Sequence, residues 1–400
     1  MNDEDRPADR VYSDRVCAPE ETFRRIRPHL ARYGITRLAR LTSLDKIGIP
    51  VWNAVSPNAH SIVINQGKGI CDVDAKVSAA MEALERAVAA EPELNMRTAS
   101  AGELAAEGLR TDPLKPLIRA GRDEVGPGDI IDWVRGNDLI AGGDVWVPRQ
   151  ALALDDTRPT RFWQSSDGLA SGNTMLEAMF HGLLERVERD AEALWNLTPS
   201  AERAAACVDP FSFDDPVISD LATRITSAGF RLKLFDMTSD IAIPCFSALI
   251  APDAASDGTA FRYIEVTNGS GCHPDPVRST IRAITEAAQS RLTFISGARD
   301  DIHPETFARP LPEHLKQELD LPPTPYRITD IADADPTLAD RIADVIERLT
   351  AAKITSAIAV HMNPDTHDFA VAKMLVPQLE HPDGERKQRF GRRAMARMLR

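Results

Sequence analysis

Three long, mostly apolar segments of this chain carry acidic side chains at one repeated spacing, and this pattern limits the folds that the chain can adopt. Residues 78–86, 181–189 and 282–290 each contain, in order, a polar residue, a small residue, two others, Glu, two others, and then Glu or Gln. Glu185 lies 103 residues after Glu82, and Glu286 lies 101 residues after Glu185. A period of this length indicates a triplicated structural unit and not a solenoid of short repeats.

Each segment is predicted to belong to a long helix. The helices are expected over about 72–90, from the end of a Gly/Ser-rich turn at 165–173 to about Trp195, and over about 276–296. Helix geometry places the polar positions of each segment on one stripe. The remaining positions are largely apolar, so we expect three mostly buried helices with acidic stripes. The stripes comprise Ser78, Glu82 and Glu85; Glu177, His181, Glu185 and Glu188; and Arg282, Glu286 and Gln289.

A glycine-rich stretch precedes each helix and is predicted to be a turn after a strand. The stretches are NQGKG (65–69), SSDGLASGN (165–173) and TNGSG (267–271). Backbone N–H groups of such turns, with nearby cations, are able to hold phosphates. The nearby cations are Lys68, Arg86, Arg189 and Arg282. The chain contains neither GxxxxGK[ST] nor GxGxxG, so a Walker or Rossmann site is not supported.

The acidic stripes have two interpretations: solvated helix faces, or carboxylates that converge on one site. For a single helix, a solvated face with ion pairs such as Glu82–Arg86 and Glu185–Arg189 is the usual explanation. Three matching helices favour convergence of the carboxylates, whose repulsion in a partly dry site must be relieved by cations. Oxygen ligands without a Cys or His cluster suit Mg²⁺, which commonly bridges carboxylates to substrate phosphates.

Composition narrows the class of partner. The net charge of −13 argues against nucleic acid and anionic membranes as partners and favours a small molecule or a peptide. Five scattered cysteines without a CxxC pair make disulfides and structural zinc improbable. No signal peptide or membrane-spanning segment is evident, which leads us to expect a cytoplasmic protein.

Shorter elements complete the expected organisation. Six prolines within 303–326 predict a surface excursion, and seven Lys or Arg from Arg386 to Arg400 predict a solvated basic tail or terminal helix. The expected divisions are an N-terminal helical segment (1–45), a catalytic domain (46–380) and the basic tail (381–400). Strands are expected near 47–55, 60–66, 129–136, 144–151, 229–236, 243–251 and 261–267, a helix over 337–351, and a hairpin of 355–362 with 368–375.

Taken together, the motifs resemble those of YcaO-domain proteins. The three stripe segments are similar to the ATP-binding motifs of that family, and DKIGIPVW, GKG, GSGCHPDP and SRLTFISGARDD extend the resemblance over roughly residues 15–380. The resemblance implies one large α+β domain with mixed or antiparallel sheets, in which the three related helices form an ATP and Mg²⁺ site.

The resemblance also assigns roles to individual residues, while the catalytic acid or base stays unknown. The implied metal ligands are Glu82, Glu85, Glu185, Glu188 and Glu286. The implied nucleotide-binding residues are Arg15, Lys68, Ser78, Arg86, Asn173, Glu177, Arg189, Arg282 and Gln289, with Thr22 as a further match to a family Ser or Thr. His181 is either catalytic or a satisfied interior histidine, and Cys272 is expected to be a small buried hydrophobe.

YcaO enzymes activate a peptide-backbone amide by transferring the γ-phosphoryl group of ATP to its oxygen. Such activation leads to a thioamide with external sulfide or to an azoline with a Cys, Ser or Thr side chain. The chain lacks the Pro-x-Pro-x-Pro ending of many azoline-forming members, and its TFISGARDD segment is similar to members that act with a TfuA protein. We therefore expect thioamidation with a TfuA-like partner that delivers the peptide, and a homodimer. An azoline-forming cyclodehydratase and a non-catalytic nucleotide-binding scaffold are the alternatives.

Overall fold

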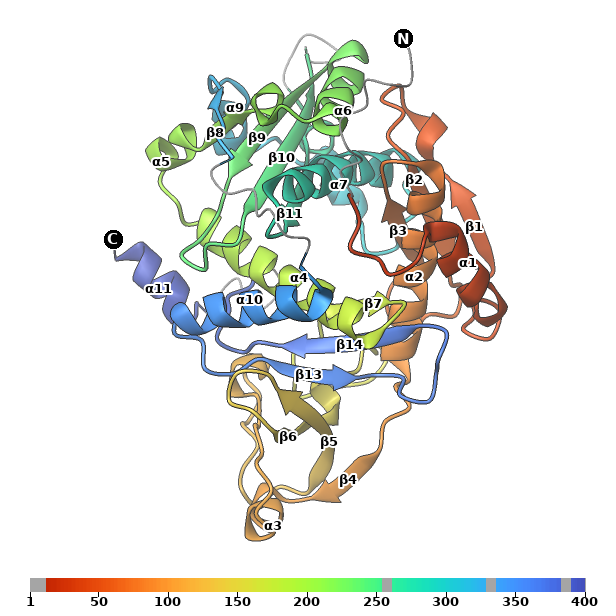
Figure 1. The fold of residues 1–400 in the computed structure, drawn as a ribbon, viewed down its shortest axis with the longest axis vertical. Helices are drawn as coiled ribbons and strands as arrows, with labels where there is room; N and C mark the ends of the chain where they lie inside the picture. The colour runs from red at the N-terminus through yellow and green to blue at the C-terminus, as the bar shows by residue number, and fades with distance from the viewer. Residues whose placement is uncertain (1–11, 254–260, 329–335, 383–389, 400) are drawn as a thin grey trace.

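All three predicted long helices are present, and each follows a strand at the edge of its sheet. The computed structural model describes residues 12–253, 261–328, 336–382 and 390–399 (Figure 1). The expected strand-and-helix unit therefore occurs three times. The units are β3 (Ile64–Lys68) with α2 (Asp72–Ala90), β7 (Leu169–Gly172) with α4 (Met175–Trp195), and β11 (Thr267–Cys272) with α7 (Pro276–Ser296).

The strands form three sheets. Their orders are β1–β2–β3, β4–β5–β13–β14–β7 with β6 beside β5, and β11–β10–β9–β8–β12. Pairs of named strands are antiparallel except β12 with β8, so the predicted α+β class is confirmed. The other strands are β1 (Arg37–Arg40), β2 (Val51–Val55), β4 (Met96–Ala99), β5 (Ile131–Asp138), β6 (Asp144–Pro148), β8 (Cys207–Asp209), β9 (Phe230–Asp236), β10 (Cys245–Pro252), β12 (Thr324–Pro325), β13 (Ile358–His361) and β14 (Ala370–Leu375).

The three units close into a ring. Each helix packs on its own strand and also contacts the strand of another unit: α2 contacts β7, α4 contacts β11, and α7 contacts β3. The apolar sides of the helices enter three different hydrophobic clusters, where Leu84, Leu184 and Ile284 are fully buried. The acidic stripes are thereby anchored on three rigid elements from three sheets.

Two of the glycine-rich stretches, 65–69 and 267–271, lie mostly in strands, which corrects the expectation of turns, whereas 165–173 contains a turn at 167–168 before β7. A Cβ on Gly67 would lie 2.0 Å from the backbone nitrogen of Ala79, and one on Gly269 would lie 2.2 Å from that of Ala287. Glycine is needed there because the helix backbone lies directly on the strand. The strand expected at 261–267 is wrong, because Tyr263–Glu265 form a short 3-10 helix and β11 begins only at Thr267.

Local chemistry defines where the long helices begin and end. The side chain of Thr174 accepts a hydrogen bond from the Glu177 N–H at the start of α4, and Asp275 caps α7 in the same way through Val277. Pro276 occupies the first turn of α7, and Gly297, with φ +56°, ends it. These signals explain why α7 agrees with the predicted range.

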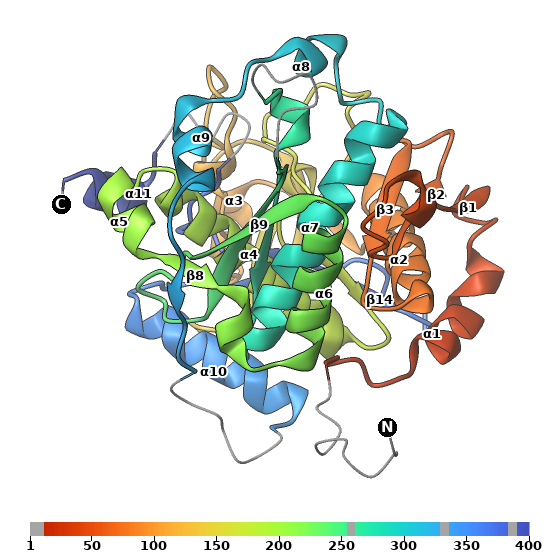
Figure 2. The ribbon, with the colours of Figure 1, turned by 90° about the horizontal axis from the view of Figure 1, so that it is seen from above.

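The remaining helices lie around the sheets (Figure 2). The predicted helix at 337–351 and the hairpin of β13 with β14 are confirmed. The proline-rich stretch forms two short helices and the edge strand β12, which tolerates proline. The helices are α1 (Pro19–Ile26), α3 (Ala101–Ala106), α5 (Ser200–Ala205), α6 (Pro216–Ser227), α8 (Pro304–Ala308), α9 (Glu313–Leu319), α10 (Leu338–Ala351) and α11 (Arg392–Met398).

The two ends of the chain pack onto the rest in the described residues. β1, which precedes the predicted boundary at residue 45, pairs with β2 across it. In α11 of the basic tail, Arg393 contacts the buried Asp190, so this part is docked and not merely solvated. Other basic residues of the tail, within 383–389 and at 400, lie outside the described residues. No described helix has the length and apolar character needed to cross a membrane.

Candidate nucleotide and metal site

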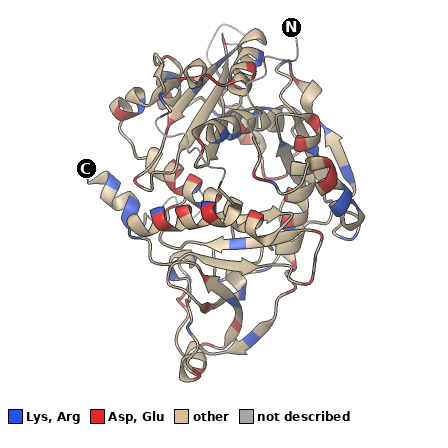
Figure 3. Ribbon diagram, viewed as in Figure 1, with Lys and Arg blue, Asp and Glu red and all other residues tan. Residues whose placement is uncertain are grey.

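The predicted acidic stripes face one another at the centre of the ring. The charges of Glu82 and Glu185 both act on Glu85, and the charge of Glu286 acts on Glu188. The carboxylates thus form a chain from α2 through α4 to α7. Lys and Arg are interspersed with Asp and Glu through most of the ribbon (Figure 3). The residues behind the net charge of −13 are therefore not gathered on one acidic face.

Three of these carboxylates repel one another. Burial raises the pKa of Glu85 well above its ordinary value, and the charges of Glu185 and Glu82 raise it further. Burial likewise raises the pKa of Glu185 from 4.5 to about 7, although Arg189 opposes this rise. Burial and the charge of Glu286 raise the pKa of Glu188. A bound cation would relieve this mutual repulsion and stabilise the charged carboxylates.

Protein cations partly neutralise the same cluster. Lys68 Nζ lies 2.6 Å from Glu286 Oε2. Burial alone would raise the pKa of Glu286, but the charges of Lys68 and Arg189 together outweigh it and lower this pKa. Arg189 lies 4.0 Å from Glu185 and 3.1 Å from Glu192. The side chains of Glu185, Glu286 and Lys68 keep 24%, 23% and 25% of their surface exposed, so they are crowded yet reachable by a ligand.

A second group of predicted residues meets at the start of α4. Asn173 donates its backbone N–H to Glu177 over 2.7 Å, and Thr22 Oγ1 donates to Asn173 Oδ1 over 2.9 Å. Arg15 Nη1 lies 3.3 Å from the fully buried Glu177 carboxylate and donates to the carbonyl of Ser171 over 3.0 Å. Arg15 and Thr22, the two N-terminal residues that match the family, therefore contact Glu177 and Asn173, which are predicted to bind the nucleotide.

Several polar atoms around the carboxylates are buried and have no hydrogen-bond partner among the described residues. They include Arg86 Nε, Gln289 Oε1 and His181 Nε2. Arg86 Nε lies 3.7 Å from Glu82, beyond hydrogen-bond reach. Ser78 is half-buried on α2, one turn before Glu82. Buried polar groups are rarely left unsatisfied, so these atoms point to a missing polar ligand.

Histidine and cysteine complete the predicted residues of the ring. Burial and the charges of Arg15 and Arg282 lower the pKa of His181 well below its ordinary value, so the ring is neutral. Arg282 Nη1 lies 3.5 Å from His181 Nδ1. Cys272 is fully buried, opposite Cys245 on β10, which confirms the expectation of a small buried hydrophobe.

Sequence reasoning missed a buried cluster of charged side chains beside Glu185, which we call the ionic layer. It comprises Asp167, Arg186, Lys373 and His381. Lys373 on β14 is 3% exposed and donates to the Ser165 carbonyl over 2.5 Å. Arg186 contacts Asp167 over 2.7 Å, and His381 contacts the same carboxylate. Burial lowers the pKa of Lys373 to about 8, although acidic neighbours oppose this. A lysine within the apolar strand AVAKML was the available signal.

The donor set fits Mg²⁺ bound together with a phosphate ligand. In the described residues, no three Asp, Glu, His or Cys side chains are close enough to hold a metal as they stand. Oxygen-only donors that come from three helices match the preference of Mg²⁺ for a few carboxylates plus substrate phosphates.

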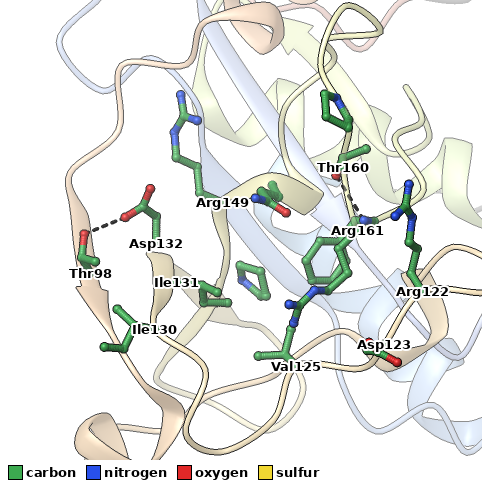
Figure 4. Close-up of a pocket in the computed structure, with 14 residues that line it drawn as sticks. Thr98, Arg122, Asp123, Val125, Ile130, Ile131, Asp132, Arg149, Thr160 and Arg161 are labelled. Atoms are coloured by element: carbon green, nitrogen blue, oxygen red, sulfur yellow. Dashed lines mark hydrogen bonds between the residues drawn. The ribbon is translucent and has the colours of Figure 1, made fainter.

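A surface recess lies elsewhere, between β4, β5 and the loop after β6 (Figure 4). Its volume is about 570 Å³, and its lining includes Arg122, Arg149, Asp123 and Asp132. Cationic and acidic side chains are mixed there, and the predicted ATP residues do not line it. We assign the chemistry to the ring because the charge pattern and the unsatisfied atoms lie there.

Known proteins match this chain over most of its length. The model of the family described as YcaO cyclodehydratase, ATP- and Mg²⁺-binding, matches residues 66–380. A protein of Rhizobium leguminosarum bv. trifolii, described as an uncharacterized protein in the tfuA 3′ region, is 41% identical over 384 residues, which are 92% of this chain and 89% of that protein.

Solved structures share the fold. The YcaO protein from Methanopyrus kandleri, bound with AMPPCP and Mg²⁺, superposes with a TM-score of 0.67 at 23% identity, over 93% of this chain and 94% of that one. A heterocyclase in complex with substrate and cofactor gives a TM-score of 0.75 at 22% identity, over 92% of this chain but 53% of the heterocyclase.

Proposed function

Because the chain belongs to the YcaO family, we propose that it uses ATP and Mg²⁺ to activate a backbone amide of a peptide or protein by O-phosphorylation. The observation that carries the proposal is the mutual repulsion of Glu85, Glu185 and Glu188 within a ring of three matched helices. The bound AMPPCP and Mg²⁺ of the Methanopyrus kandleri relative support the choice of ligands.

The residues divide into two roles in this proposal. The five stripe glutamates, which are Glu82, Glu85, Glu185, Glu188 and Glu286, would hold Mg²⁺. The metal, when bound, would neutralise charge on the phosphates. The residues that would bind or orient ATP are Arg15, Lys68, Ser78, Arg86, Asn173, Glu177, Arg189, Arg282 and Gln289.

The proposed reaction makes the amide oxygen into a leaving group. A nucleophile adds to the carbonyl carbon, and the resulting oxyanion attacks the γ-phosphorus of ATP, which releases ADP. The C–O bond then breaks, and inorganic phosphate leaves with the former amide oxygen. Arg15, Arg189 and Arg282 would stabilise the negative charge on the transferring phosphoryl group.

We propose sulfide as the nucleophile and a thioamide as the product. Addition of HS⁻ and loss of phosphate form the C=S bond, and the proton of HS⁻ leaves with the phosphate. The support is the relative in the tfuA 3′ region, 41% identical to this chain, which also favours a TfuA-like partner. A homodimer and a cytoplasmic location complete the proposal.

Azoline formation is the second candidate, because the matching family model is described as a cyclodehydratase and a structural relative as a heterocyclase. In that reaction a Cys, Ser or Thr side chain of the peptide attacks its own backbone carbonyl. The phosphoryl-transfer step is common to both reactions.

Mass spectrometry of the product separates the candidates. The chain would be incubated with ATP, Mg²⁺, sulfide, a TfuA-like protein and a peptide encoded beside its gene. Thioamidation adds about 16 Da and cyclodehydration removes about 18 Da, both after phosphoryl transfer. Release of phosphate without a mass change would contradict amide activation, and ATP binding without turnover would favour the scaffold alternative.

A further inference from the structure

The N-terminal strap, residues 12–18, reaches the site without forming a helix or strand. Its side chains and the Val16 N–H hold it in place. Tyr12 donates its hydroxyl to Asp215 over 3.1 Å, and the Val16 N–H donates to Glu177. Arg15 lies between these points and contacts Glu177 and the Ser171 carbonyl. The position of Arg15 therefore depends on how well the strap is anchored.

Asp14 is the most strongly anchored residue of the strap. Its carboxylate contacts His273 Nε2 over 2.8 Å, Arg341 Nη1 over 3.2 Å, and Arg278 Nη1. These partners come from the segment after β11, from α10 and from α7. The side chain of Asp14 is 5% exposed. Burial alone would raise the pKa of Asp14, but His273 and Arg278 outweigh it and hold the pKa far below the ordinary range.

The hydrogen bonds around His273 fix its tautomer. The Asp275 N–H donates to His273 Nδ1 over 2.8 Å, so this nitrogen carries the lone pair. Burial lowers the pKa of His273 despite the neighbouring Asp14, so the ring is neutral and its proton lies on Nε2. His273 therefore donates to Asp14, and a backbone group of the α7 cap orients the donor.

Arg15 has a cationic neighbour, Arg282, as well as two anionic ones. The charge of Arg282 acts on Arg15, while the charges of Glu177 and Asp14 favour its charged form. Two guanidinium groups that are held near each other suit an anion such as a phosphate, but they repel when no anion is bound. A free strap would let Arg15 move away from Arg282.

We propose that Asp14 is a positioning residue for nucleotide binding, which ties the strap to α7 and α10 so that Arg15 is in place before ATP arrives. This inference rests on the proposed function, in which Arg15 contacts the nucleotide. Asp14 itself does not touch the phosphates. Without the Asp14 contacts, ATP binding has to order the strap. The apparent affinity then equals the intrinsic affinity multiplied by the fraction of molecules in which the strap is already ordered.

Two effects of removing the carboxylate oppose each other. Loss of a negative charge near the site favours an anionic ligand, whereas loss of the anchor disfavours it. Two arginines, Arg278 and Arg341, already offset the Asp14 charge, so the anchoring effect dominates. The entropy of ordering two residues of backbone predicts that Asp14→Asn weakens nucleotide binding by about 30- to 700-fold.

Calorimetry with AMPPCP and Mg²⁺ on the full chain tests this, using Asp14→Asn, Arg15→Ala and the double variant. If Asp14 acts through Arg15, Asp14→Asn weakens binding in the wild-type background but changes it by less than about 3-fold in the Arg15→Ala background. Equal weakening in both backgrounds, or unchanged or tighter binding by Asp14→Asn alone, would overturn the inference.

Two controls keep the outcomes distinct. Absence of AMPPCP binding by the wild type would contradict the proposed function and not only the role of Asp14. If Asp14→Asn does not fold, Arg341→Gln replaces it in the same cycle, because this partner lies at the border of the cluster with a side chain that is 14% exposed. The same two patterns of coupling then support or overturn the inference.

Discussion

The raised pKa of Glu185 predicts that, without a bound metal or nucleotide, the free energy of unfolding depends on pH. The pKa in the folded state is about 7, against 4.5 as the ordinary value. Between these values the folded state binds more protons than the unfolded state, so the free energy of unfolding decreases as pH rises from about 4.5 to 7. At 1.36 kcal/mol per pKa unit, the loss attributable to Glu185 is up to about 3 kcal/mol above pH 7.

Glu185→Gln isolates this contribution. The amide keeps the size of the side chain and an oxygen that can accept the Gly168 N–H, now 3.2 Å from Glu185. Urea unfolding in a metal chelator would be measured from pH 4.5 to 8 for the wild type and the variant. We expect equal stability near pH 4.5 and an advantage for Glu185→Gln that grows to up to about 3 kcal/mol by pH 7.5.

The matched control is Glu347→Gln, which removes an exposed carboxylate of α10. Its difference from the wild type should stay flat over the same pH range. A flat difference for Glu185→Gln as well would refute the conclusion that the carboxylates of the ring repel one another. AMPPCP with Mg²⁺ at 1,000 times its Kd should reverse the order, because a ligand at that concentration stabilises the wild type by about 4.1 kcal/mol.

Three further variants test other parts of the structure. Glu286→Gln should reduce Mg²⁺-dependent ATP turnover to below about 1% while circular dichroism shows an intact fold, and near-normal turnover would contradict the assignment of Glu286 as a ligand. Gly269→Ala should lower the free energy of unfolding by at least about 2 kcal/mol, because its Cβ would lie 2.2 Å from the Ala287 nitrogen, whereas Gly128→Ala, with open space around it, should not. Lys373→Met removes a charge that lowers the pKa of Glu185, so the pH midpoint of AMPPCP and Mg²⁺ binding should rise by roughly 0.5 to 1 unit; a downward shift would count against the ionic layer.

The sequence predicted the parts of the site that have a local period. The spacing of Glu82, Glu85 and their counterparts required only the 3.6-residue geometry of a helix, so their convergence could be expected before any coordinates. The roles of the glycine-rich stretches could not, because Gly67 and Gly269 are explained by helix backbones that lie 12 to 18 residues further along the chain. A local turn signal and a close-packing signal look alike in sequence.

Long-range ionic contacts were also beyond sequence reasoning. Asp14 meets His273 and Arg278, which are 259 and 264 residues away, and nothing near Asp14 marks it as buried. Lys373 differed, since a charged residue inside an apolar strand is itself informative. The docked part of the basic tail depends on Asp190, a carboxylate on the side of α4 away from the acidic stripe.

The ring of three units has a consequence for the orientation of its ligand. A three-fold arrangement presents three related directions, and the glutamates at 82, 185 and 286 do not distinguish them. One turn earlier, the equivalent positions hold a hydroxyl in Ser78, an imidazole in His181 and a guanidinium in Arg282. An asymmetric molecule at the centre meets three chemically different sides, so divergence of the copies converts a symmetric cradle into one with a single preferred direction.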